Sequence, residues 1–409
     1  MSLSTELSGV QAAQTDIDTI GNNIANVNTT GFKASVADFA DLYGSAAQTA
    51  PGQGVFTASL AQSYTEGTVS QTGNPLDVAI SGNGFFQLQT ASGIVYSRDG
   101  AFQIDKDGHL VNSVGDMVMG FAPPPAGGGA SVGQLQPIQI SSANIAASAT
   151  SKLTIAVNLP STDAAINTTT TPFSTSNPKS YDESTTTSVY DSLGTNLSLT
   201  TYFTRVSGSG SPNQWQTHYS LTNSAGALIA SGAGPTLIFN SSGQLVSGSG
   251  TIAVSRLPDG AAPLNIALNF TGSSLSNLPF GVNSVSNDGS GGGAFTGVQI
   301  AANGAVTGQY SNGATRVFGT IALANFADPQ GLVPLTGNVW AASIASGPAT
   351  TGMPATAGLG QLEPGALEGS NVDLSTQLVN LIVAQQAYQA NVQGINVEQQ
   401  NLQRLLTIQ

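Results

Sequence analysis

Hydrophobic residues recur every three or four positions at both ends of the chain, and every second position between the ends. A spacing of three and four places apolar side chains on one side of an α-helix, whereas a spacing of two places them on one face of a β-strand. The change of period therefore predicts a multidomain α+β protein. We expect long helices at the two termini and mainly β structure in the middle.

Both predicted terminal helices carry the heptad pattern of a coiled coil. The first should end within residues 26–31, and the second should begin beside Asp373, in a Ser-Asn-Val-Asp capping sequence. Glu6 takes one polar position in the first seam, and Gln385 and Gln399 take two in the second. The apolar seam positions used for assembly would be Leu3, Val10, Ile17, Ile20, Ile24, Val27, Leu374, Leu378, Leu381, Tyr388, Val392, Ile395, Leu402 and Leu406.

The outer faces of the second helix carry very little charge. Residues 371–409 contain nine Gln and five Asn, but only Asp373, Glu398 and Arg404 as charged side chains. A solvated helix usually carries pairs of opposite charges along its exposed face. Two interpretations remain open. The helices pair only within one chain, or every face of the pair meets another copy of the chain without burying unpaired charges.

Between the ends, short runs rich in β-branched and aromatic residues alternate with Asn-Gly and Asp-Gly dipeptides, which is typical of successive β-hairpins. We expect a nested, discontinuous topology, in which the paired terminal helices form a coiled-coil-like domain and two mainly-β domains follow. A continuous string of domains is the competing topology. Pro123–Gly129, Gly289–Gly293 and Gly347–Gly365 would act as hinges. The expected divisions are 1–33 with 369–409 (helical), 34–70 with 363–368 (connecting segments), 71–145 with 288–362 (β) and 146–287 (inserted β).

Composition argues against several classes of function. The chain has 9 Lys and Arg against 22 Asp and Glu, a formal net charge of -13, and no cysteine. Scattered cations do not suit a nucleic acid partner, and the lack of cysteine excludes thiol chemistry and disulfides. Asp105-Lys106-Asp107-Gly108 could begin a calcium loop, but it lacks the further ligands and is better explained as a tight turn. We expect no enzyme activity, no metal and no cofactor.

Targeting signals are also missing from the sequence. Residues 1–32 contain no Lys or Arg and no unbroken apolar core, so they do not form a secretory signal peptide. No apolar run is long enough to insert into a membrane as a helix. The chain is therefore expected to be cytoplasmic, or exported by a route that uses no cleaved signal.

Several motifs resemble those of the bacterial flagellar rod and hook axial proteins, the hook members in particular. The segments that carry the likeness are residues 20–33, 369–375 and 378–391, with shorter matches at 82–86, 96–102, 310–313 and 323–326. Gln386 stands where the family usually has Arg. The motif residues are Asn22, Asn23, Asn26, Asn28, Gly31, Phe32, Asn371, Asp373, Gln385 and Asn391.

This resemblance implies an extracellular homopolymer in the hook and basal body of the flagellum. The polymer would be a curved, flexible tube that transmits torque from rod to filament as a universal joint. Implied partners are other copies of the chain, the distal rod protein, the hook cap, the hook–filament junction protein and the flagellar type III export machinery. A distal rod or hook-associated subunit is the near alternative. A secreted carbohydrate-binding β protein, using Tyr202, Trp215 and Tyr219, is the remote one.

Overall fold

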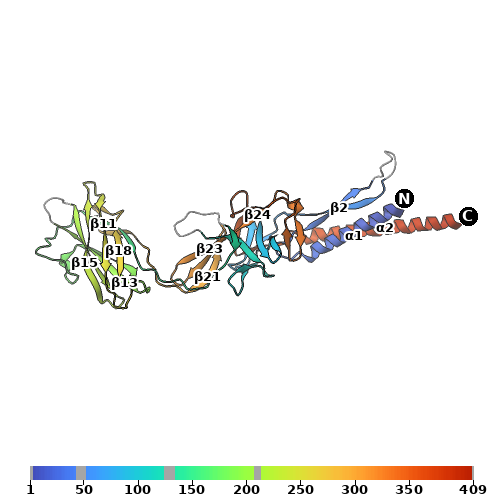
Figure 1. The fold of residues 1–409 in the computed structure, drawn as a ribbon. Helices are drawn as coiled ribbons and strands as arrows, with labels where there is room; N and C mark the ends of the chain where they lie inside the picture. Colours follow the sequence, from blue (N-terminus) through green and yellow to red (C-terminus); the bar gives the residue numbers. More distant parts are fainter. Residues whose placement is uncertain (1–2, 43–51, 124–133, 207–212, 408–409) are drawn as a thin grey trace. The chain divides into compact units, whose positions relative to one another are not determined.

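The chain divides into two compact units (Figure 1). The computed structural model describes residues 3–42, 52–123, 134–206 and 213–407, with side chains up to residue 404. Unit 1 consists of Met1–Ser142, Gly297–Gly308 and Thr315–Gln409, and unit 2 of Ala143–Thr296 and Gln309–Ala314. Within the described residues there are two α-helices and otherwise mainly β-strands, so the predicted combination of terminal helices with β structure is confirmed.

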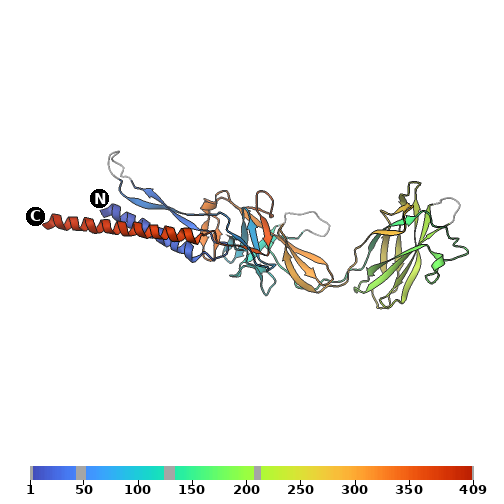
Figure 2. The ribbon, with the colours of Figure 1, turned by 180° about the vertical axis from the view of Figure 1, so that it is seen from behind.

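The two helices belong to unit 1 and lie side by side in opposite directions (Figures 1 and 2). Helix α1 (Leu3–Ala25) ends where an Asn- and Thr-rich turn begins, and α2 (Leu374–Thr407) follows Asp373. The Asp373 carboxylate accepts a hydrogen bond from the Thr376 backbone N–H at 2.7 Å, which is the contact of a helix N-cap. The predicted end of α1 and the predicted cap of α2 are therefore confirmed.

A β-hairpin covers one side of α1. Strands β1 (Ser35–Asp41) and β2 (Val55–Gln62) pair antiparallel, from Ser35 opposite Gln62 to Asp41 opposite Val55. Their side chains alternate only weakly between buried and exposed. The sequence predicted only connecting segments in this part of the chain, and no strands. Next, β3 (Val69–Gln71) pairs with β29 (Ala366–Glu368), just before α2.

The largest sheet of unit 1 combines strands from two distant parts of the sequence. Strand β9 pairs with β23, β5 with β24 and β6 with β26, all antiparallel. A separate pair joins β4 (Val78–Ser81) to β28 (Gln361–Pro364). The strands of the large sheet are β5 (Phe85–Thr90), β6 (Gly93–Ser97), β7 (Gln103–Ile104), β8 (Leu110–Val111), β9 (Met117–Phe121), β10 (Leu135–Pro137), β21 (Phe295–Ile300), β22 (Ala305–Tyr310), β23 (Thr315–Ile321), β24 (Leu323–Asn325), β25 (Val333–Leu335), β26 (Val339–Ala341) and β27 (Thr350–Gly352).

The Asp105–Gly108 segment forms the turn between β7 and β8. The Asp105 carboxylate accepts hydrogen bonds from the backbone N–H groups of Asp107 and His109, at 2.9 and 2.7 Å. Gly108 has a φ of 84°, a value that glycine adopts more readily than other residues. The turn interpretation of this acidic segment is confirmed.

Unit 2 contains two five-stranded sheets that share one hydrophobic core. Trp215 and Phe203 of the first sheet belong to the same buried cluster as Ile155 and Ile266 of the second. Tyr202 and Tyr219 are also buried, so the aromatic residues considered for carbohydrate binding are core residues. The first sheet contains β12 (Glu183–Tyr190), β13 (Asn196–Arg205), β14 (Gln214–Thr222), β15 (Leu228–Phe239) and β16 (Leu245–Ser247); the second contains β11 (Lys152–Pro160), β17 (Ser249–Val254), β18 (Leu264–Asn269), β19 (Ser274–Ser276) and β20 (Gly281–Asn287).

The glycines of Gly289–Gly293 are packed against neighbouring atoms of unit 2. A Cβ added to Gly289 would lie 2.0 Å from Thr150 Oγ1, and one added to Gly293 would lie 2.5 Å from Asn312 Oδ1. Here glycine permits close approach of chain segments, because any larger residue would collide with them. The expected Pro123–Gly129 hinge lies almost entirely outside the described residues. Neither helix, over its described length, has a stretch apolar enough to cross a membrane.

Candidate functional site

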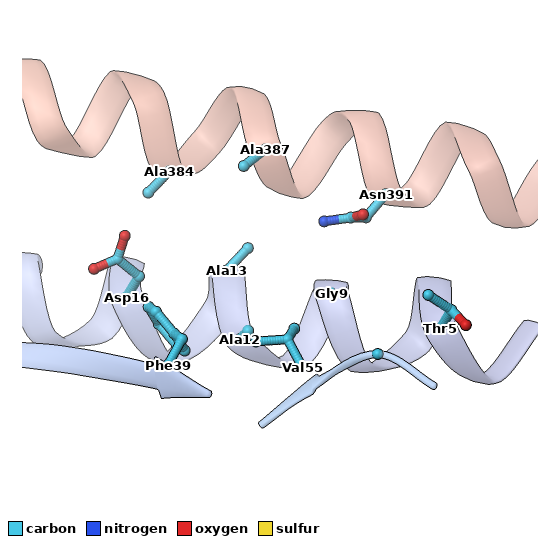
Figure 3. A pocket seen from close by; sticks show the side chains of 11 residues that line it. Thr5, Gly9, Ala12, Ala13, Asp16, Phe39, Val55, Ala384, Ala387 and Asn391 are labelled. Atoms are coloured by element: carbon cyan, nitrogen blue, oxygen red, sulfur yellow. The ribbon is translucent and has the colours of Figure 1, made fainter. Parts of the chain in front are cut away.

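Helices α1 and α2 approach closely because glycine leaves room for a side chain of the other helix (Figure 3). The amide of Asn391 on α2 lies over Gly9 of α1, where an added Cβ would be 2.7 Å from Asn391 Oδ1. In the reverse direction, the Glu6 carboxylate of α1 lies over Gly394 of α2, at 2.6 Å from an added Cβ. Each helix therefore accepts a polar side chain from its partner at a glycine.

The contacts between the helices repeat every seven residues. Asn23 Nδ2 donates to Gln377 Oε1 at 3.3 Å, Asp16 and Ala384 line one groove, and Asn391 lies over Gly9. Burial raises the pKa of the Asp16 carboxyl. The contact line on α2 thus passes through positions 377, 384 and 391, one residue before the predicted line through 378, 385 and 392. Small side chains at the contact allow this closer packing.

The hairpin forms the third wall of an open groove of about 450 Å³. Phe39 of β1 and Val55 of β2 face Ala12 of α1, and Ala387 of α2 lies opposite (Figure 3). The Val55 backbone N–H donates to Ser8 Oγ at 3.1 Å, which fixes the hairpin to the helix. Mostly apolar side chains line this groove, so a second apolar surface could pack into it.

The seam residues predicted for assembly differ in their exposure. Ile20 is buried. Val10, Ile17, Ile24, Val27, Leu381, Tyr388, Val392 and Ile395 are half-buried, Leu3, Leu374, Leu378 and Leu402 are exposed, and the Leu406 side chain lies outside the described part. On α2, four further large apolar residues that the seam prediction did not include are exposed: Val379, Ile382, Val383 and Val397. Large apolar side chains of α2 are therefore left on its outer side.

The Asn-rich motif at the end of α1 joins this helix to the hairpin. The Asn23 side chain is buried; its Nδ2 donates to the Ser35 carbonyl at 2.7 Å, and its Oδ1 accepts from the Ser35 N–H at 2.9 Å. Asn26 Nδ2 donates to the Asn22 carbonyl and closes the last helical turn. Asn28 is exposed and Phe32 is half-buried. The motif thus reproduces, with a side chain, the hydrogen bonds of a strand pair.

Gly31 is required by its backbone conformation and by its neighbours. Its φ is 66°, and an added Cβ would lie 2.6 Å from the backbone carbonyl carbon of Arg98. At the other end of the chain, Asn371 Oδ1 accepts from the Ala34 N–H at 2.8 Å, and Asn371 Nδ2 donates to the Ser63 carbonyl at 2.7 Å. Gln385 is exposed. The motif residues near the end of α1 and the start of α2 are therefore held by specific contacts.

A buried charge network, here called the joint, connects the end of α1 and the start of α2 to the β part of unit 1. Glu368 binds Lys33 Nζ through Oε1 at 2.5 Å and Arg98 through Oε2 at 3.1 Å. The side chains of Lys33 and Glu368 are 0% exposed and that of Arg98 is 5% exposed. Lys33 also donates to the Thr65 carbonyl, and Arg98 to the Gly82 carbonyl. The Gly67 N–H also donates to Glu368 Oε1 at 3.0 Å, so four chain segments meet at this carboxylate.

The electrostatics of the joint depend on Glu368. Burial lowers the pKa of the Lys33 ammonium, and the hydrogen bond and charge of Glu368 oppose that effect. Arg98 lies 5.4 Å from the Phe85 ring centre, which adds a cation–π contact. The motifs found in the sequence include Lys33 and Arg98 but not Glu368. The rarity of charged residues in the chain was the available signal, since a cation that becomes buried requires a nearby anion.

Four family models match parts of the chain. They are flagella basal body rod protein at residues 3–33, flagellar hook protein FlgE/F/G D1 domain at 79–166, flagellar basal body protein FlaE D2 domain at 158–290, and flagellar basal body rod FlgEFG protein C-terminal at 363–408. Together these matches extend over the helical ends and both β regions.

Full-length relatives carry the same description. The chain is 40% identical over 416 residues to the flagellar hook protein FlgE of Salmonella typhimurium, and 41% identical over 420 residues to that of Escherichia coli, with 100% of each chain covered. A crystal structure of Helicobacter pylori flagellar hook protein FlgE2 has a similar fold, with a TM-score of 0.56 at 15% identity over 72% of this chain and 99% of that chain. On the full-length identity to these relatives, the chain belongs to the flagellar hook protein FlgE family.

Proposed function

We propose that the chain is the structural subunit of the bacterial flagellar hook, which self-assembles into a curved, flexible tube and transmits torque from rod to filament. The observation that carries this proposal is the uncovered apolar stripe of α2. Leu378, Val379, Ile382 and Val383 are 46–60% exposed. A helix with a solvated outer side usually presents charged and polar residues there, so the stripe is suited to contact with another copy.

The paired helices would form the inner, coiled-coil-like wall of the tube. On this proposal the exposed seam residues Leu3, Leu374, Leu378 and Leu402 contact neighbouring copies, and Leu406 extends the surface that they form. The half-buried seam residues contact both the other helix of the same chain and a neighbouring copy. The motif residues, from Asn22 to Phe32 and at Asn371, Asp373, Gln385 and Asn391, hold the helices in position or contact neighbours. The antiparallel helix contacts and the groove beside them support this arrangement.

We also propose the nested division of the chain. Residues 1–33 with 369–409 would act as the helical domain, 34–70 with 363–368 as the connecting part, 71–145 with 288–362 as the middle β domain and 146–287 as the outer one. Pairing of β5, β6 and β9 with strands that follow residue 314 supports it. The proposed partners are the distal rod protein, the hook cap, the hook–filament junction protein and the type III export machinery, with export that needs no cleaved signal peptide.

Electron microscopy of the concentrated full-length chain tests the assembly. We expect long curved tubes, whereas short straight rods would support the distal-rod alternative. The double variant Ile382→Ser with Val383→Ser should abolish tubes at concentrations where the wild type assembles, because each buried aliphatic side chain contributes about 1.5–3 kcal/mol. Val246→Ser, at an exposed position of unit 2, is the matched control. Normal tubes from the double variant would contradict the proposed role of the stripe.

A further inference from the structure

Two loops meet where the two sheets of unit 2 come together. The first is the turn that follows β12, at residues 191–195, and the second is the loop between β17 and β18. Thr195 Oγ1 donates to Asp259 Oδ2 at 2.9 Å, and the Ala262 N–H donates to Ser192 Oγ at 2.8 Å. Since β12 belongs to one sheet and β17 and β18 to the other, these loops tie the sheets to each other.

Asp191 stands at the centre of this contact and is only half satisfied. It is 0% exposed. Its Oδ1 accepts hydrogen bonds from the Leu193 and Thr195 N–H groups, both at 2.9 Å. Its Oδ2 is buried and receives no hydrogen bond from any described residue. A buried carboxylate oxygen without a donor is costly, so this atom needs a positive or hydrogen-bonding partner.

The group that lies beside Asp191 is a second carboxyl group. Asp191 accepts from the N–H of Thr195 and Asp259 accepts from its hydroxyl, so one residue holds both carboxyl groups. Contact with the Asp191 side chain, followed by the hydrogen bond from the Thr195 hydroxyl, lowers the pKa of the Asp259 carboxyl. In the described part of the chain, no Lys, Arg or His side chain pairs with either group. Two adjacent acidic groups therefore lack a counter-charge.

We propose that Asp191 Oδ2 and the Asp259 carboxylate bind one calcium ion, with solvent and loop oxygens completing the coordination. Calcium takes oxygen ligands in a flexible geometry, whereas magnesium requires near-ideal octahedral coordination and releases water reluctantly. Asp259 is exposed, so an ion can enter from solvent. Two carboxylates in a partly open site fit the weak affinity of extracellular calcium modules, about 0.1–1 mM. The extracellular location that supplies calcium at such concentrations rests on the proposed function.

Bound calcium would link the sheets and stabilise unit 2. The test uses the full-length, unassembled chain carrying Trp340→Phe, so that the buried Trp215 of unit 2 is the remaining fluorescence reporter. After removal of metal with EDTA and dialysis, urea unfolding is compared without and with CaCl₂. With about 10 mM CaCl₂ and a dissociation constant near 1 mM, the folding equilibrium constant of unit 2 should rise about tenfold.

Asp191→Asn is the decisive variant. Its Oδ1 can keep both turn hydrogen bonds, while the new amide can donate to Asp259 in place of the ion. We therefore expect a chain that folds without calcium and whose response to CaCl₂ falls to about twofold or less. Asp259→Asn should also lose the response. MgCl₂ at the same concentration, and NaCl at matched ionic strength, should stabilise the wild type much less than CaCl₂ does.

Three results would overturn the calcium proposal. The first is an equal response of the wild type and Asp191→Asn, which would mean general charge screening. The second is an equal effect of CaCl₂ and MgCl₂. The third is a wild type that ignores calcium but gains stability on acidification, since the two carboxyl groups would then share a proton. Tube formation is measured separately by electron microscopy. A chain that forms no tubes would contradict the hook proposal, whereas a missing CaCl₂ response in urea unfolding would contradict the calcium proposal alone.

Discussion

Replacement of Glu368 by Gln should destabilise unit 1 strongly, although the two side chains have the same shape. The substitution removes the only negative charge in contact with Lys33 and Arg98 within the described joint. Removal of one partner from a buried ion pair costs about 3–5 kcal/mol, because the remaining charge stays buried without compensation. For a unit of this size, roughly 2–4 °C is lost per kcal/mol. We therefore expect a fall in Tm of about 6–20 °C.

The measurement requires a reporter that belongs to unit 1 alone. Trp340 is buried in unit 1, and Trp215 is buried in the core of unit 2. In a Trp215→Phe background, fluorescence during thermal unfolding reports mainly on unit 1. This separation is necessary because one transition does not describe a chain of two units.

Asp107→Asn is the matched control for Glu368→Gln. It breaks the Lys106–Asp107 pair, whose side chains are 86% and 58% exposed, and an exposed pair contributes at most about 1 kcal/mol. Adding Lys33→Met to Glu368→Gln should recover part of the lost stability, since one uncompensated cation is removed. A Glu368→Gln variant that unfolds at the same temperature as the control would refute the electrostatic account of the joint.

Two further perturbations test the helix contact and the aromatic residues near the joint. Gly9→Ala should weaken the helix pair and lower helix content by far-UV circular dichroism, because the new methyl group collides with Asn391. Gly21→Ala should raise helix content instead, since no atom lies within 4 Å of an added Cβ and alanine favours the helix. Equal helix content in the two variants would contradict the contact. Burial, with the charge of Asp328, raises the pKa of Tyr64 from 10.0 to about 12. Between these values the unfolded phenol ionises while the folded one stays protonated, so unit 1 should lose stability as pH rises through that range, and Tyr64→Phe should reduce the slope of stability against pH.

The β regions were largely predictable from the sequence because their strands end at residues with a special backbone conformation. Gly84, Gly93 and Gly304 have φ values of 127°, 130° and 83°, and each marks a turn beside a predicted strand. Four strands are short runs of the kind from which successive hairpins were predicted: Phe85–Thr90, Met117–Phe121, Phe295–Ile300 and Ala305–Tyr310. Asp373 was predictable for the same local reason, since a cap acts within one helical turn.

The β1–β2 hairpin and the one-residue offset of the contact line on α2 were not predictable, since neither depends on a strong local pattern. Strands β1 and β2 expose Val36, Phe56 and Leu60, so hydrophobicity does not alternate with burial along them. On the helices, apolar periodicity selects large side chains for the seam. The observed contact uses Gly9, Ala384 and other small residues instead, whose packing depends on tertiary structure.

The position of Glu368 also sets the order in which the joint can form. Lys33 and Arg98 are synthesised early, while their shared carboxylate follows Lys33 by 335 residues and Arg98 by 270. A ribosome-bound chain that does not yet include Glu368 has two cations ready for burial but no anion to receive them, and burying them alone is unfavourable. The end of α1 and the start of α2 therefore cannot be fastened to the β part until the chain from Lys33 to Glu368 is present. The joint thus closes only after the strands of both β regions have been synthesised.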